Sequence, residues 1–172
     1  MASFLEDFFA RLEIAPLITP NLENLTTIML QFCKCIPFEN IDVVQKKPID
    51  ISPDVIHEKL LKKMRGGYCW ELNLILLRAL EELNYNTKLF GCKVRWNKQP
   101  EQLSTYTHNF LTVSLSESEN YIVDVGFAGT NSVAPIRFDN LNEPQKCPEG
   151  TFRVIDDGEG WRHLQWEVST IK

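Results

Sequence analysis

The spacing of hydrophobic residues changes once along the 172-residue chain, and this change constrains the fold more than any other feature. Up to about residue 85 the apolar side chains recur every three or four residues, as on one face of an amphipathic helix. Beyond Asn86 they alternate with polar residues, as in a half-buried strand. We therefore predict an α+β fold, in which an N-terminal helical bundle is followed by a β-barrel-like antiparallel strand domain. The expected domains are residues 1–85 and 86–172.

Four helices are expected in the first half. Ser3 and Glu6 form a capping-box pattern that predicts the start of the first helix. The second helix is expected to start at Thr19 and Pro20, since an N-cap residue followed by proline is typical of a helix start. Pro53 predicts the start of the third helix in the same way, and a strongly amphipathic fourth helix ends this half. The apolar face of the third helix is expected to consist of Ile56, Leu60, Leu61 and Met64.

Short strands separated by turn residues are expected in the second half. Strand-like runs cover residues 92–96, 110–115, 121–127, 151–155 and 161–168. The last two runs flank a glycine-containing segment, which predicts a hairpin. In the first half, residues 38–50 lack helical spacing and are expected to form a loop.

The composition argues against several classes of function. A net charge of −5 without a long basic segment does not fit a nucleic-acid partner. The N-terminus lacks a secretory signal and no apolar run approaches the ~20 residues of a membrane span, so we expect a cytoplasmic protein without a membrane partner. Five cysteines without a disulfide spacing fit free thiols in a reducing compartment. Cys33 and Cys35 are interpreted as core residues rather than zinc ligands, so no metal is predicted.

The segment from Arg65 to Asn73 places one cysteine between two glycines and an apolar helix. Gly66 and Gly67 permit a sharp turn, and Cys69 follows near the helix start, where the helix dipole favours a thiolate. The alternative is a glycine-rich helix entry with a buried, inert cysteine. Other residues must distinguish these two interpretations.

A cysteine nucleophile needs an imidazole that accepts its proton, and the chain has three histidines. His57 is expected on the exposed face of a helix, and His163 lies in the last hairpin. His108, near the start of a predicted strand, is the better candidate. The alternative for His108 is a polar residue at a strand start whose hydrogen bonds are satisfied locally.

Asp124 interrupts an apolar run, where an unpaired buried carboxylate would cost several kcal/mol. If the preceding turn closes around Glu117, Asp124 opposes Phe110 across the sheet. It then lies diagonal to His108, at about 7 Å or less between Cβ atoms. The pattern predicts a Cys69–His108–Asp124 triad in which the carboxylate orients the imidazole. The alternative for Asp124 is a strand-end residue that caps a turn.

The chain resembles the arylamine N-acetyltransferase family. Four motifs carry the resemblance, in the order of the family and with similar spacing. They are Ile-Pro-Phe-Glu-Asn-Ile-Asp at 36–42, Arg-Gly-Gly-Tyr-Cys-Trp-Glu at 65–71, Thr-His at 107–108 and Val-Asp-Val-Gly-Phe at 123–127. The similarity extends over nearly the whole chain, which makes it far more specific than any single motif.

This resemblance implies a cysteine-protease-like triad of Cys69, His108 and Asp124 that transfers acetyl groups. Acetyl-CoA would acetylate Cys69, and an arylamine, arylhydrazine or heterocyclic amine would then accept the acetyl group in a ping-pong cycle. The implied partners are coenzyme A and a small aromatic amine or hydrazine, as in xenobiotic metabolism.

The resemblance also implies further site residues. Phe38, Val94 and Phe127 match the aryl-pocket side chains of the family, and Ser104 and Thr105 match a segment that approaches coenzyme A. Each of these five residues could equally belong to the core or to a loop.

Arg65 and Glu39 match charged positions in the family's two strongest N-terminal motifs. We expect Arg65 to pair with Glu39 or with Glu71. Either ion pair would hold the glycine turn in place and so support the triad.

Members of the family generally continue beyond Lys172, into a third domain that covers the cleft and contributes to coenzyme A binding. We therefore expect either a fragment or a natural short form, with weak or absent acetyl transfer and with self-association through the surface left by that domain. Cys69 is still expected to be unusually reactive to alkylating agents. Two alternatives stay open. One is a related amide synthase or another Cys-His-Asp acyltransferase, such as a transglutaminase-like thiol enzyme. The other is a catalytically inactive homologue that acts as a binding partner.

Overall fold

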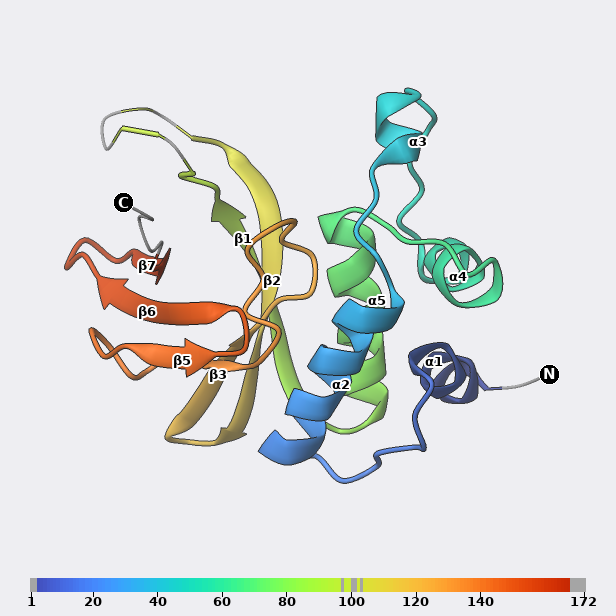
Figure 1. The fold of residues 1–172 in the computed structure, drawn as a ribbon, viewed down its shortest axis with the longest axis horizontal. Coiled ribbons are helices and arrows are strands. Elements are labelled where there is room, and N and C mark those ends of the chain that lie inside the picture. The colour runs from blue at the N-terminus through green and yellow to red at the C-terminus, as the bar shows by residue number, and fades with distance from the viewer. Residues whose placement is uncertain (1–2, 97, 100–101, 103, 168–172) are drawn as a thin grey trace.

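The computed structural model describes residues 3–96, 98–99, 102 and 104–167. Its elements form three layers (Figure 1). The helices pack on one face of a four-stranded antiparallel sheet, and a three-stranded antiparallel sheet packs on the other face. This arrangement confirms the α+β class, with helices followed by antiparallel strands.

The helical segments in the described residues all precede the first strand. They are α1 (Phe4–Leu12), α2 (Leu22–Cys35), α3 (Ile41–Val44), α4 (Pro53–His57), the π-helical turn η1 (Glu58–Lys62) and α5 (Cys69–Glu82). The expected capping box begins α1: the Ser3 Oγ accepts from the Glu6 amide at 3.2 Å, and the Glu6 carboxylate accepts from the Ser3 amide at 2.7 Å. The expected N-cap of α2 at Thr19 is wrong. Asn21 caps this helix, because its Oδ1 accepts from the Asn24 amide at 2.8 Å.

Two open sheets contain the described strands. The strands are β1 (Asn86–Lys93), β2 (Tyr106–Ser116), β3 (Glu119–Val123), β4 (Ile136–Arg137), β5 (Gln145–Cys147), β6 (Gly150–Asp156) and β7 (Arg162–Trp166). The larger sheet has the order β1–β2–β3–β4 and the smaller one β5–β6–β7, with every pairing antiparallel. The predicted hairpin near the C-terminus is formed by β6 and β7.

The predicted β-barrel does not form among the described strands, since β1 and β4 are the edges of the larger sheet. Instead of closing on itself, the sheet is covered on both faces. Successive residues of β3 alternate between the two covering layers: Tyr121 and Val123 pack with the helices, whereas Ile122 packs with the smaller sheet.

The apolar face of the third predicted helix is shorter at its C-terminal end than we expected. It begins at Pro53, as expected, and continues from α4 into η1. Ile56, Leu60 and Leu61 are buried, but Met64 is 56% exposed and has a φ of 55°. The backbone has therefore left the helix before Met64, and the apolar face ends with the π-helical turn.

Two other local expectations are wrong. His57 is not an exposed helix residue, because α1 packs against it: its Nε2 lies 2.8 Å from Asp7 Oδ2, and its ring packs edge-on against Phe4. Residues 38–50 are not entirely a loop, since they include the short helix α3.

The main hydrophobic core joins the helices to the larger sheet. Phe32 of α2 and Leu76 of α5 are fully buried in the same cluster as Leu111 and Val113 of β2. The change from helix to strand falls between Glu82 and Asn86, close to the predicted boundary at residue 85. The division into two domains stays a prediction, and both parts contribute to one core.

We expect Leu76→Ala to lower the free energy of unfolding by about 2–5 kcal/mol, because it opens a cavity in this shared core. Urea titration followed by circular dichroism measures the effect. Leu164→Ala is the matched control, since Leu164 on β7 is 45% exposed and its truncation should cost less than about 0.5 kcal/mol. Equal losses in the two variants would contradict this assignment of the core.

Candidate active site

The turn that precedes Cys69 requires glycine for steric reasons. The Gly67 carbonyl accepts from the Glu39 amide at 2.9 Å, and the Gly67 amide donates to the Pro37 carbonyl at 3.3 Å. A Cβ atom on Gly66 would lie 2.1 Å from the Pro37 carbonyl oxygen. The turn is thus held closely against the preceding segment, and α5 begins directly after it with Cys69 as its first residue.

Arg65 anchors this turn through two carboxylates. Its guanidinium lies 2.5 Å from Glu39 Oε1 and 3.0 Å from Asp42 Oδ2. Hydrogen bonds from Lys59, the largest effect, and from Arg65 lower the pKa of Asp42 to about 2. Of the two expected partners of Arg65, the structure selects Glu39, while Glu71 binds Lys59 instead.

β2 brings His108 beside Asp124 and Cys69. The His108 Nε2 lies 2.6 Å from Asp124 Oδ2, and the imidazole side chain is only 6% exposed. The Cys69 Sγ lies 3.9 Å from the carbonyl oxygen of Thr107, the residue before His108. The half-buried thiol therefore lies next to a buried imidazole–carboxylate pair.

The environment of His108 favours its charged form. Desolvation is the largest single influence on the pKa of His108 and lowers it, but interactions with Asp124 and Cys69 together raise the pKa to about 9. The imidazole is consequently protonated at neutral pH. A positive charge beside a thiol at a helix start favours the thiolate.

The strand register places Asp124 as the sequence predicted. Leu111 pairs with Val123, so the next position places Asp124 opposite Phe110, just beyond the end of β3. The Asp124 Oδ1 also accepts from the Gly126 amide at 2.8 Å. This second oxygen is thus occupied while Oδ2 binds the imidazole.

Asn73 is a site residue that the sequence analysis missed. It is fully buried on α5, and its Nδ2 donates to the Asn109 carbonyl at 2.8 Å and to Asp124 Oδ1 at 3.0 Å. Its Oδ1 accepts from the Val125 amide at 3.1 Å. The available signal was an amide one helical turn after Cys69 within a largely apolar helix.

The backbone at Gly126 lies directly against the start of α5. A Cβ atom at this position would lie 2.8 Å from the Cys69 Cα and 2.9 Å from the Asn73 Nδ2. Any larger residue must therefore displace the helix that carries Cys69 or the segment after β3.

Two of the expected aryl-pocket residues lie beside these elements. The ring of Phe127 packs edge-on against His108, with 5.0 Å between ring centroids. Phe38 is 41% exposed and forms an isolated β-bridge with Gly67 in the turn before Cys69.

The other expected binding residues lie in the connection between β1 and β2. Val94 follows β1, and its carbonyl accepts from the Ser104 Oγ at 2.9 Å. Ser104 is half-buried and Thr105 is exposed, just before β2 begins at Tyr106. Ser104 and Thr105 thus lead into the strand that carries His108, and the hydrogen bond from Ser104 connects them to Val94.

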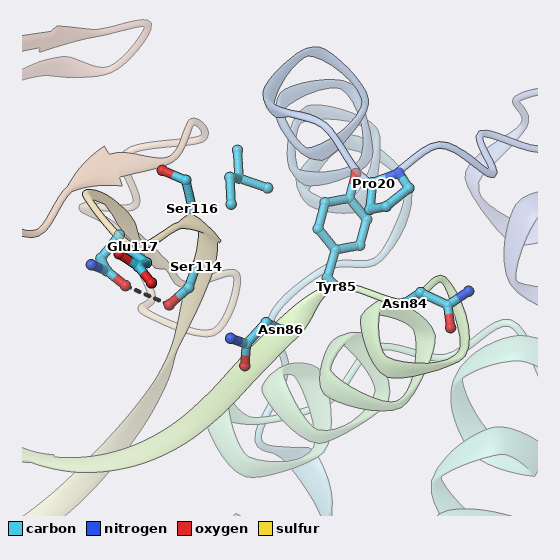
Figure 2. A pocket seen from close by; sticks show the side chains of 9 residues that line it. Pro20, Asn84, Tyr85, Asn86, Ser114, Ser116 and Glu117 are labelled. Carbon is cyan, nitrogen blue, oxygen red and sulfur yellow. Dashed lines mark hydrogen bonds between the residues drawn. The ribbon is translucent and has the colours of Figure 1, made fainter.

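A cleft among the described residues is separate from the candidate triad. It measures about 460 Å³ and lies between the α5–β1 turn and the β2–β3 hairpin, with Tyr85 and Pro20 on one side and Ser114, Ser116 and Glu117 on the other (Figure 2). None of the expected site residues lines it. The site residues expected from the sequence therefore lie elsewhere on the molecule.

Neither a metal centre nor a membrane-crossing helix is found in the described part of the chain. No group of three or more histidine, cysteine, aspartate or glutamate side chains there could hold a metal ion. None of the helices within the same ranges is long and apolar enough to span a bilayer.

Comparison with known proteins shows a consistent similarity. A family model described as N-acetyltransferase matches residues 21–172. The Salmonella typhimurium arylamine N-acetyltransferase / N-hydroxyarylamine O-acetyltransferase is 37% identical, over 97% of this chain and 60% of that relative. The solved structure of the arylamine N-acetyltransferase from S. typhimurium matches with a TM-score of 0.90 at 38% identity, over 98% of this chain and 60% of that one.

A second solved structure, Mycobacterium marinum arylamine N-acetyltransferase in complex with CoA, is also similar. It matches with a TM-score of 0.89 at 30% identity, over 96% of this chain and 61% of that one. The chain spans about 60% of the length of the curated relatives from S. typhimurium and Escherichia coli.

We expect the His108 ring to titrate near pH 9 in NMR spectra, and nearer its ordinary value of 6.5 in Asp124→Asn, which lacks the anionic partner. Because the folded pKa is raised, this pair stabilises the protein fully below pH 6.5, and the stabilisation is lost as the pH rises through 9. The stability difference between wild type and Asp124→Asn should shrink over that range. A wild-type midpoint at 6.5 would contradict the geometry.

We expect Gly126→Ala to reduce the free energy of unfolding by about 1–3 kcal/mol and to slow alkylation of Cys69, because the new methyl group overlaps the Cys69 backbone. Chemical denaturation and iodoacetamide labelling measure the two effects. Gly91→Ala is the matched control, since its Cβ atom would meet only the Tyr106 ring at 3.4 Å. Wild-type behaviour of Gly126→Ala would disprove the close approach.

Proposed function

The chain belongs to the arylamine N-acetyltransferase family, and from this premise we propose that it transfers an acetyl group from acetyl-CoA to the nitrogen of arylamines, arylhydrazines or heterocyclic amines. The observation that carries the proposal is the ion pair of His108 with Asp124 beside Cys69. The names of the relatives support an arylamine acceptor, and the relative solved with CoA supports an acyl-CoA donor.

Cys69 is the proposed nucleophile, His108 its acid–base partner and Asp124 the residue that orients the imidazole. The bond from His108 Nε2 to Asp124 leaves Nδ1 as the nitrogen for proton exchange with Cys69. The helix start and the imidazolium both favour the thiolate. Backbone amides near Cys69 supply donors for the developing oxyanion.

In the first step, the Cys69 thiolate attacks the thioester carbonyl of acetyl-CoA and a carbon–sulfur bond forms. The tetrahedral intermediate collapses as the bond to the coenzyme A sulfur breaks, and the departing thiolate takes a proton from the His108 imidazolium. One thioester replaces another in this step. The exchange is therefore nearly neutral in free energy.

In the second step, the amine nitrogen attacks the acetyl-Cys69 carbonyl. The nitrogen loses a proton to the neutral His108, and the Cys69 sulfur leaves as a thiolate. An aromatic amine is already uncharged at neutral pH, so it attacks without prior deprotonation. The amide product is much more stable than a thioester, and this difference drives the cycle forward.

Substrate contacts are proposed from positions that match the family. Phe38, Val94 and Phe127 would line the aryl pocket, and the contact of Phe127 with the His108 ring supports this role. Ser104 and Thr105 would approach coenzyme A. The pairing of Arg65 with Glu39 supports the turn that presents Cys69.

The expected compartment is the cytoplasm. All five cysteines lack a disulfide partner in the structure, which is compatible with a reducing environment. Acceptors would then be small aromatic amines or hydrazines that reach the cell interior, including foreign compounds.

We expect incubation with acetyl-CoA to add one acetyl group to Cys69, detected by mass spectrometry of the intact protein and its peptides. Cys69→Ser should not be labelled, whereas Cys147→Ser, which removes another free thiol, should be labelled like wild type. Addition of an arylamine should remove the label and release the N-acetyl product.

Two outcomes would contradict the proposal. An unlabelled wild-type Cys69 would exclude the acetyl-enzyme. Labelling by a different acyl thioester, but not by acetyl-CoA, would assign the triad to a related acyltransferase.

A further inference from the structure

A half-buried lysine, Lys59, connects the segment before the glycine turn to the start of α5. Its ammonium lies 2.7 Å from Glu71 Oε1 and 3.0 Å from Glu71 Oε2, and also 3.0 Å from Asp42 Oδ2. Glu39 Oε1 is further away, at 3.8 Å. The Lys59 side chain is only 13% exposed, so this cation is largely removed from water.

The π-helical turn η1 supplies two lysines with different partners. Lys59 binds the carboxylates around the glycine turn, whereas Lys62 binds Asp7 on α1 at 2.5 Å. Lys62 is 44% exposed, in contrast to Lys59. Lys59 and Lys62 are therefore two cations from the same turn, and of these two only Lys59 contacts the first turn of α5.

Glu71 is the link between Lys59 and the nucleophile. Its side chain is 4% exposed, and its Oε2 accepts from the Tyr68 amide at 3.0 Å, immediately before Cys69. A Cβ atom on Gly67 would lie 3.0 Å from the same oxygen, so the carboxylate packs tightly into the turn. Without a cation, this buried negative charge would oppose a thiolate at the start of the same helix.

We propose that Lys59 is a positioning residue for Cys69, which acts through Glu71 by neutralising its carboxylate and fixing it as the cap of the Tyr68 amide. The inference rests on the proposed function only in taking Cys69 as the nucleophile. Lys59 allows Glu71 to cap the helix without cancelling the positive potential that stabilises the thiolate.

The charged and titratable groups around these residues come from several elements. Lys59 faces Glu39 and Asp42, which Arg65 also binds, together with Glu71 and the nearby Tyr68. Cys69 faces His108, Cys92 and Tyr68, and Asp124 binds His108. Desolvation is the largest influence on the pKa of Lys59 and lowers it, but the hydrogen bonds to Glu71 and Asp42 outweigh it and raise the pKa. Lys59 therefore carries its positive charge at neutral pH.

The test is the pH profile of Cys69 alkylation by iodoacetamide, followed by peptide mass spectrometry so that the other four cysteines are counted separately. We expect Lys59→Met to raise the pH midpoint of Cys69 alkylation by about 0.5 to 1 unit, and so to slow the reaction about three- to tenfold below that midpoint. Lys62→Met is the matched control from the same turn and should keep the wild-type midpoint.

Two further variants separate the charge effect from a general loss of structure. Glu71→Gln keeps an oxygen for the Tyr68 amide but removes one negative charge from the start of α5, while Lys59 keeps its contact with Asp42, so the midpoint should fall. The double variant K59M/E71Q removes both charges and should return the midpoint to within about 0.3 units of wild type. If Lys59→Met does not fold, the direction of the Glu71→Gln shift decides the proposal.

Three results would overturn the inference. They are a wild-type midpoint in Lys59→Met, a raised midpoint in Glu71→Gln, and a double variant that stays as slow as folded Lys59→Met. The proposed function fails separately, if wild-type Cys69 is not acetylated by acetyl-CoA. The role of Lys59 is tested by comparing the alkylation of Cys69 in each variant with that in wild type, and this comparison needs no acetyl-CoA.

Discussion

The side-chain amide of Asn73 fixes the position of the helix that carries Cys69 against the strands that carry the imidazole. It donates to the Asn109 carbonyl and to Asp124, and it accepts from the Val125 amide. The amide is fully buried, so breaking any of these hydrogen bonds leaves a polar group without water or protein to satisfy it. The helix and the sheet consequently have one low-energy arrangement, and the thiol–imidazole geometry follows from it.

Two ion pairs balance the charges of the groups around Cys69. On one side of Cys69, the buried carboxylate of Glu71 is balanced by Lys59. On the other side, the imidazolium of His108 is balanced by Asp124. The thiol thus lies between two ion pairs that are each nearly neutral as a unit. The backbone of Gly126 packs closely against Cys69 and Asn73 in the same region.

The features that could be predicted from the sequence depend on local interactions or on the strand register of a short hairpin. The position of Asp124 was predictable because a strand has a period of two and the preceding turn is short. Thr19 and Asn21 are both acceptable caps by type, and only the tertiary path of the chain selects Asn21. The exposure of Met64 depends on the π-helical turn, and the open sheets depend on long-range packing. Asn73 was missed because an amide beside an apolar stripe can equally face solvent.

The contacts of the candidate site join parts of the chain that are far apart in sequence. Cys69 meets the residue before His108 across 38 positions, and Asn73 meets Asp124 across 51. Contacts of this kind form only after long loops have closed, whereas helices can form from local interactions. The candidate site is therefore a late product of folding. A chain with its helices in place but its sheet undocked would keep Cys69 apart from Thr107 and His108, so these contacts report whether the native topology is complete.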